Sequence, residues 1–128
     1  MASWAEIRSY ASASYELAED DEEGLRLVWL FANGRRQQIA VRPFIALERE
    51  WCDFVSPICR RPALPPEIAV KLSRRFAVGA ICLDDEVFVL RYTAPTSCLD
   101  TTTFDLLLQV LAATADELEA DFAAADDF

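Results

Sequence analysis

Residues 25–42 constrain the fold more than any other part of the chain. Two segments of strand character, LRLVWLFA and RRQQIAVR, flank the pair Asn33-Gly34. Asn-Gly is the preferred dipeptide of two-residue type I′ turns, in which both central residues take a positive φ. The pattern therefore predicts a β-hairpin and, with it, an antiparallel sheet.

A two-residue turn at Asn33-Gly34 also fixes which side chains share a face of the hairpin. It predicts three facing pairs: Phe31 with Arg36, Trp29 with Gln38, and Val28 with Ile39. One face then carries an ordinary core stripe: Val28, Leu30, Ile39 and Val41. The opposite face mixes Leu27, Trp29 and Phe31 with polar neighbours, which is typical of an interaction surface. We predict that these three residues contact a partner; cover by a terminal helix or loop explains the face equally well.

The remaining elements follow from periodicity and caps. The sequence predicts a helix over 3–13 capped by Ser3 with Glu6, a helix over 65–76, and a long helix that starts after the cap Asp100. Five other strands are expected besides the one ending at 31: residues 14–19, 35–42, 50–56 (ended by Pro57), 80–83 and 87–93. The last helix presents an apolar stripe, widened by Leu106 and Val110: Phe104, Leu107, Leu108, Leu111, Ala115, Leu118 and Phe122.

This order, α-β-β-β-β-α-β-β-α, predicts a single α+β domain over residues 1–128, with helices packed on one face of an antiparallel sheet. The end of the chain, residues 123–128, is expected to fray.

Charge is unevenly distributed along the 128 residues, whose net charge is −10. Residues 35–75 carry 4 acids and 9 bases, whereas the segments before and after them have balances of −5 and −10. An acidic chain repels nucleic acid and anionic lipid at long range, so neither is an expected partner. The basic middle either faces the acidic ends of the same fold or of a second copy, or binds an anion.

Catalytic chemistry has little support in this sequence. There is no histidine and only three glycines, so no Ser-His or Cys-His pair and no glycine-rich phosphate loop can form. The four cysteines (Cys52, Cys59, Cys82 and Cys98) lack paired zinc spacings. Cys52 and Cys59 are seven apart, so a regular strand through both would point them to opposite faces. We predict no catalytic residue, cofactor or metal, and no enzyme activity.

The first residues, MASWAEIRSY, lack the segments of an export signal, and no apolar run approaches the ~20 residues that span a bilayer. We therefore expect a cytoplasmic protein whose cysteines remain thiols.

Three segments, EWCDFVSPIC, RRFAVGAICLDDEVFVLRYTAP and LDTTTFDLLLQVLAATADELE, resemble the YbjN-like proteins over roughly residues 4–120. These are small bacterial domains with a type III secretion chaperone-like fold, described loosely as sensory transduction regulators. The resemblance implies helices on one face of an antiparallel sheet, often in a homodimer formed through the middle helix. It carries no residue-level site.

Together these observations predict a non-enzymatic protein-binding module, chaperone-like or regulatory, that acts as a homodimer. The stripe Ile68, Leu72 and Phe76 is the expected dimer interface. The alternative is a small-molecule or anion sensor that uses the basic segment, through Arg35, Arg36, Arg42 or Arg60.

Overall fold

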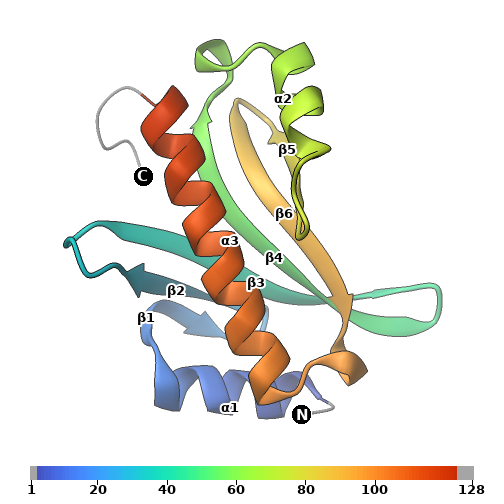
Figure 1. Ribbon diagram of the computed structural model, residues 1–128. Coiled ribbons are helices and arrows are strands. Elements are labelled where there is room, and N and C mark those ends of the chain that lie inside the picture. The colour runs from blue at the N-terminus through green and yellow to red at the C-terminus, as the bar shows by residue number, and fades with distance from the viewer. Residues whose placement is uncertain (1–2, 124–128) are drawn as a thin grey trace.

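The computed structural model describes residues 3–123, and it contains three α-helices and six strands (Figure 1). Their bounds, in chain order, are α1 (Trp4–Ser14), β1 (Glu16–Asp21), β2 (Gly24–Leu30), β3 (Arg36–Ala46), β4 (Arg49–Arg60), α2 (Pro66–Ser73), β5 (Ala80–Asp84), β6 (Val87–Pro95) and α3 (Thr101–Phe122). Short 3₁₀ turns precede α2 and α3. Of the end predicted to fray, residues 124–128 lie outside the described residues.

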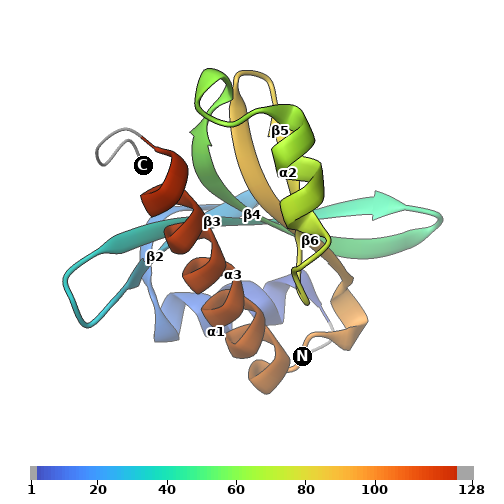
Figure 2. The ribbon, with the colours of Figure 1, turned by 45° about the horizontal axis from the view of Figure 1, so that its top comes forward.

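The strands form one antiparallel sheet in the order β1-β2-β3-β4-β6-β5, so β1 and β5 are its edges. α3 crosses the middle of the sheet over β3 and β4, α1 lies beside β1, and α2 lies over β5 (Figures 1 and 2). The predicted order of elements and the α+β class with helices on one face are confirmed.

α3 supplies more core residues than any other element. Its cap is the predicted one: the Asp100 carboxylate accepts a hydrogen bond from the Thr103 backbone N–H at 2.7 Å, and that bond lowers the pKa of Asp100. The predicted stripe is buried from Phe104 to Leu118. The wider apolar arc is wrong at Leu106, whose side chain is 55% exposed.

The β2–β3 hairpin corrects the predicted turn. The Phe31 N–H donates to the Arg35 carbonyl at 2.9 Å, and the Gly34 N–H donates to the Phe31 carbonyl at 3.0 Å. The loop therefore has three residues, 32–34, and Gly34 (φ 87°) takes the left-handed position that such loops require. The added residue shifts the register by one, so Leu27 pairs with Ile39 and Trp29 with Gln37.

That shift exchanges the two faces of β2, so side chains predicted to face the core face the opposite way. Leu25 and Leu27 lie in the core, whereas Leu30, predicted as a core residue, is 59% exposed. Val28 is buried as predicted, although it lies outside the main core cluster. Ile39 and Val41 are core residues, as expected from their strand.

β4 also departs from expectation, because Pro57 does not end it. The strand continues to Arg60 through a register irregularity between Pro57 and Cys59. This bulge inserts one residue and reverses the alternation of faces. Cys52 and Cys59 consequently both lie in the core, and burial raises the pKa of both thiols.

Residues 43–48, predicted as a connection, instead extend β3 to Ala46 and turn back at Leu47-Glu48. α2 is shorter than predicted and ends at Ser73, so Phe76 lies beyond it.

Candidate functional site

A groove of about 650 Å³ opens between α1 and the end of the edge strand β1. The side facing it from the helix is made mostly of small side chains. Its lining residues are Trp4, Ala5, Arg8, Ser9, Ser12, Ala13, Asp20 and Glu22. The buried side of the same helix, Ile7 and Ala11, holds α1 on the core.

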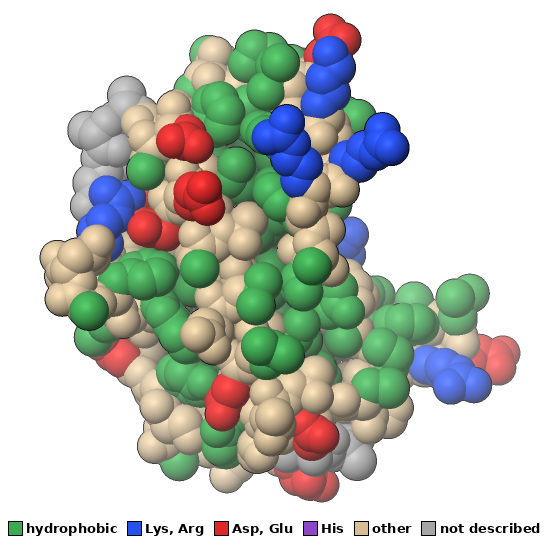
Figure 3. All heavy atoms as spheres, in the orientation of Figure 1, with side chains coloured by type: hydrophobic (Ala, Val, Ile, Leu, Met, Phe, Trp, Pro, Cys, Tyr) green, Lys and Arg blue, Asp and Glu red, His purple; other side chains and the backbone are tan. Residues whose placement is uncertain are grey.

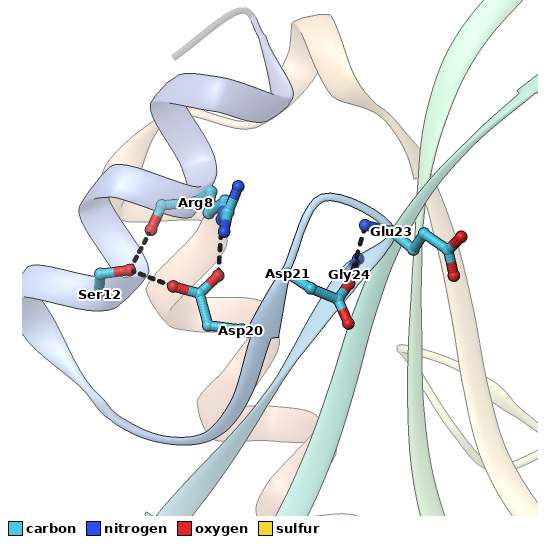
Figure 4. Close-up of polar contacts among 6 residues, drawn as sticks. All are labelled: Arg8, Ser12, Asp20, Asp21, Glu23 and Gly24. Carbon is cyan, nitrogen blue, oxygen red and sulfur yellow. Dashed lines mark hydrogen bonds and ion pairs between the residues drawn. The ribbon is translucent and has the colours of Figure 1, made fainter.

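One polar cluster fixes the walls of this groove relative to each other. The Arg8 Nε lies 2.6 Å from a carboxylate oxygen of Asp20, and the Ser12 hydroxyl lies 3.4 Å from the other oxygen (Figure 4). The same hydroxyl donates to the Arg8 carbonyl at 2.9 Å. Arg8 and Asp20 are each about one-third exposed, so the pair positions β1 against α1 more than it stabilises the fold.

A second polar cluster ties this region to α3. The hydroxyls of Tyr10, from α1, and Tyr15, from the residue after it, both donate to the carboxylate of Asp105. The hydrogen bond to Asp105 raises the pKa of Tyr10, and burial together with the same carboxylate raises the pKa of Tyr15. These hydrogen bonds fasten α1 and the start of the following segment to the longest helix, α3.

β1 is strongly acidic, with four carboxylates in its six residues ELAEDD. It has a bulge between Leu17 and Glu19 and pairs only with β2. Charge and bulges protect an edge strand from indiscriminate pairing. Three of these four carboxylates are in ion pairs within the chain: Glu16 with Arg36, Glu19 with Arg26 and Asp20 with Arg8. At its end, the Asp21 carboxylate accepts hydrogen bonds from the N–H groups of Glu23 and Gly24 (Figure 4).

The sequence did not indicate this groove. Ser9, Ser12 and Ala13 add nothing to the apolar stripe of α1, and the run from Asp20 to Glu23 is typical of a solvated turn, whereas β1 extends to Asp21. Small side chains leave room for a ligand but give no sequence pattern that predicts a binding site. The site is recognised only from the packing of α1 beside β1.

The residues predicted to contact a partner lie elsewhere. Leu27 is 0% exposed within the core, so its predicted contact role is corrected: the register shift places it where no partner reaches it. Trp29 is half-buried, with its ring centroid 5.9 Å from that of Tyr15, and Phe31 is half-buried against the core. Contact through Trp29 and Phe31 stays a prediction.

The predicted dimer stripe is only partly open to solvent. Ile68 is 39% exposed, whereas Leu72 and Phe76 pack against the chain's own core. Their role in a dimer stays a prediction.

The arginines of the alternative anion sensor do not converge. Arg35 is bonded to Asp116 at 2.8 Å and Arg36 to Glu16 at 3.2 Å. Arg42 lines a separate hollow of about 220 Å³ whose other charged residues are three acids and Arg26. No observation therefore favours this alternative.

Within residues 3–123, no group of three or more Cys, Asp or Glu side chains is placed to hold a metal ion. The four cysteines are free thiols. No helix in the described part of the chain is long and apolar enough to cross a bilayer.

No protein-family model matches the chain, and no curated protein sequence matches it. Solved structures with a similar fold include the following two. A chain of the HopA1–SchA chaperone–effector complex has a TM-score of 0.60 and 13% identity, with 89% of this chain and 88% of that chain covered. A chain of the ExsC–ExsE complex has a TM-score of 0.64 and 17% identity, with 98% and 100% covered. At these identities the likeness shows the fold, and the expected chaperone-like fold is confirmed.

Proposed function

We propose that this protein is a non-enzymatic protein-binding module, chaperone-like or regulatory, that holds an extended segment of another protein in the groove between α1 and β1. The observation that carries the proposal is a groove of about 650 Å³ beside a sheet edge. An extended segment can add backbone hydrogen bonds to such an edge while its side chains enter neighbouring pockets.

Three further features support this function. The fold is shared with a chain from a complex described as chaperone–effector. Glu22, in the groove lining, is in no ion pair within residues 3–123 and favours a segment that carries Lys or Arg. The resemblance to YbjN-like proteins favours a bacterial regulatory role and, with the four free thiols, a cytoplasmic location.

The proposal includes a homodimer formed through α2. The helix keeps apolar side chains exposed on both flanks, with Ile68 39% and Val70 74% accessible. Buried apolar area would hold such a dimer at high salt, because only its rim charges are screened. Light scattering at tens of micromolar tests this part, and a monomer there overturns it.

The groove is tested by filling it. Ser9 and Ala13 are exposed residues of its lining, so Ser9→Trp obstructs the groove without altering the core. Gln109→Trp, at an exposed position of α3, is the matched control. Tagged wild type and both variants are used to capture partners, which are quantified by mass spectrometry.

We expect one or two near-stoichiometric partners that Ser9→Trp loses and Gln109→Trp keeps. Peptides that tile the captured partner then locate the bound segment, whose affinity should fall as salt rises. Equal capture by Ser9→Trp and wild type contradicts binding in the groove. A parallel Trp29→Ala capture asks whether the predicted contact at Trp29 contributes.

A further inference from the structure

The hairpin formed by β3 and β4 projects from the body of the protein and ends in large apolar side chains (Figures 1 and 2). Leu47, in the turn, is 85% exposed, the highest exposed fraction of any large apolar residue in the described part of the chain. Ile45, next to the turn, is 71% exposed. We call Ile45, Leu47 and Glu48 the hairpin tip.

Leucine at position 47 requires an unfavourable backbone conformation in this turn. Leu47 (φ 53°) and Glu48 (φ 61°) both lie in the left-handed region, where Asn-Gly is the usual pair of a two-residue turn. The ladder beneath is regular from Ala40 to Ala46, and the Trp51 Nε1–H donates to the Ala46 carbonyl at 2.8 Å. The ladder thus holds an unfavourable turn in place, and Leu47 has almost no packing within the chain to offset it.

A surface of complementary character lies on α2. Val70 is 74% exposed, and Arg74, the C-cap of α2 four residues later, is exposed on the same flank. Within residues 3–123, neither Arg74 nor Glu48 of the hairpin tip is in an ion pair. Glu48 and Arg74 therefore place opposite, uncompensated charges beside exposed apolar side chains, and each is followed in the chain by an exposed arginine, Arg49 or Arg75, that is also in no ion pair of residues 3–123. We call Val70 and Arg74 the α2 flank.

The shape of the molecule suits an exchange of these surfaces between copies. Figure 3 shows a notch between the projecting hairpin and the basic side chains on the same side of the molecule. When one chain carries both a projection and its complementary surface, two copies related by a twofold axis make the contact twice and close the assembly.

We propose that the hairpin tip docks on the α2 flank of a second copy, Leu47 against Val70 and Glu48 beside Arg74. The inference rests on the proposed homodimer and specifies its geometry. The opposite charges of Glu48 and Arg74, carried by the same chain, favour a second copy over an unrelated client.

The first experiment measures self-association by sedimentation in wild type and in Leu47→Asn/Glu48→Gly, which replaces the tip by the usual turn pair. We expect the dissociation constant of the dimer to rise about tenfold or more, because each copy loses a buried leucine. Leu30→Asn is the control: Leu30 is 59% exposed but lies outside the tip, so the constant should not change.

The second experiment identifies the contact itself. Benzoylphenylalanine at position 47 should form cross-links between chains that map to residues 66–75. Glu48→Arg and Arg74→Glu should each weaken the dimer several-fold, and the two together should restore it.

A monomeric wild type, a dimer that Leu47→Asn/Glu48→Gly leaves unchanged, or cross-links that map elsewhere would each overturn the proposal. The groove is independent of it: partner capture that persists in the tip variant leaves the client-binding function intact. If Ser9→Trp loses partner capture while its dimer is unchanged, dimerisation does not depend on the groove.

Discussion

Two consecutive hairpins of this sheet differ in how their turn residues relate to the turn that they form. β2–β3 contains Asn33-Gly34, the favoured pair for a two-residue turn, yet it uses a three-residue loop with glycine at the left-handed position. β3–β4 contains Leu47-Glu48, an unfavourable pair, yet it makes the two-residue turn with both residues at positive φ. Local turn preference is overruled in both hairpins.

The reason differs between them. In β2–β3, the longer loop directs Leu25, Leu27 and Trp29 toward the core, a larger apolar set than the Val28 and Leu30 pair of the alternative register. Burial of that extra area outweighs a turn preference worth about 1 kcal/mol. In β3–β4, the exposed tip gains no burial within the chain, so the regular ladder alone sets the turn.

The largest effect should come from the residue that decides the first register. Leu27→Ala removes a fully buried side chain and should lower the free energy of unfolding by about 2–5 kcal/mol. Leu30→Ala, in the same strand but 59% exposed, should change it by less than about 0.5 kcal/mol. Urea unfolding of both variants measures the difference. Similar losses for the two would contradict the observed register.

The same hairpins show what the sequence can and cannot predict. The elements and their order were predictable, because helical stripes such as Phe104 to Leu118 and the cap at Asp100 are local signals. The face of β2 was not, because a single added loop residue reverses every side chain of the strand. The bulge near Pro57 hid the shared face of Cys52 and Cys59 for the same reason.

The candidate groove lay beyond sequence reasoning for a different reason. Small residues of α1 become a site only because β1 ends beside them, and contact between these elements follows from the whole fold. The exposed tip at Leu47 was equally hidden, since an apolar residue in a turn cannot be distinguished from a core residue by pattern alone.

The next largest effect should come from a buried polar pair at the base of the first hairpin. Gln37, opposite Trp29, is fully buried and donates to the Ser56 hydroxyl and the Pro57 carbonyl, each at 2.9 Å. Ser56 in turn donates to the Gln38 carbonyl at 2.7 Å. Ser56→Ala leaves these groups underpaired and should lower the free energy of unfolding by about 1–3 kcal/mol.

Ser12→Ala is the control for that variant, because Ser12 is an exposed hydroxyl that also makes hydrogen bonds. It should cost less than about 0.5 kcal/mol in the same urea titration. Equal losses at Ser12 and Ser56 would show that burial of the polar pair adds nothing.

The second hairpin should respond with the opposite sign. Leu47→Asn/Glu48→Gly relieves two left-handed positions and should raise the free energy of unfolding of the monomer by about 1 kcal/mol. The measurement is a urea titration at a concentration where the dimer has dissociated, because dimerisation would stabilise wild type by mass action. A lower stability in the variant would show that Leu47 packs within its own chain.

An effect of similar size and opposite sign should come from the glycine of the first turn. Gly34 has a φ of 87°, and a Cβ built there meets no atom within 4 Å, so only backbone conformation opposes a side chain. Gly34→Ala should therefore lower the free energy of unfolding by about 1 kcal/mol, and Gly34→Asn by less, because asparagine tolerates the left-handed region. Both are read from urea titrations against wild type. If Gly34→Ala left the free energy of unfolding unchanged, the loop would have moved to another register. In that variant, Leu27→Ala and Leu30→Ala would then no longer differ in their effect on stability. A loss at Gly34 together with a gain at Leu47-Glu48 would establish that the first turn is matched to its conformation and the second is maintained against it.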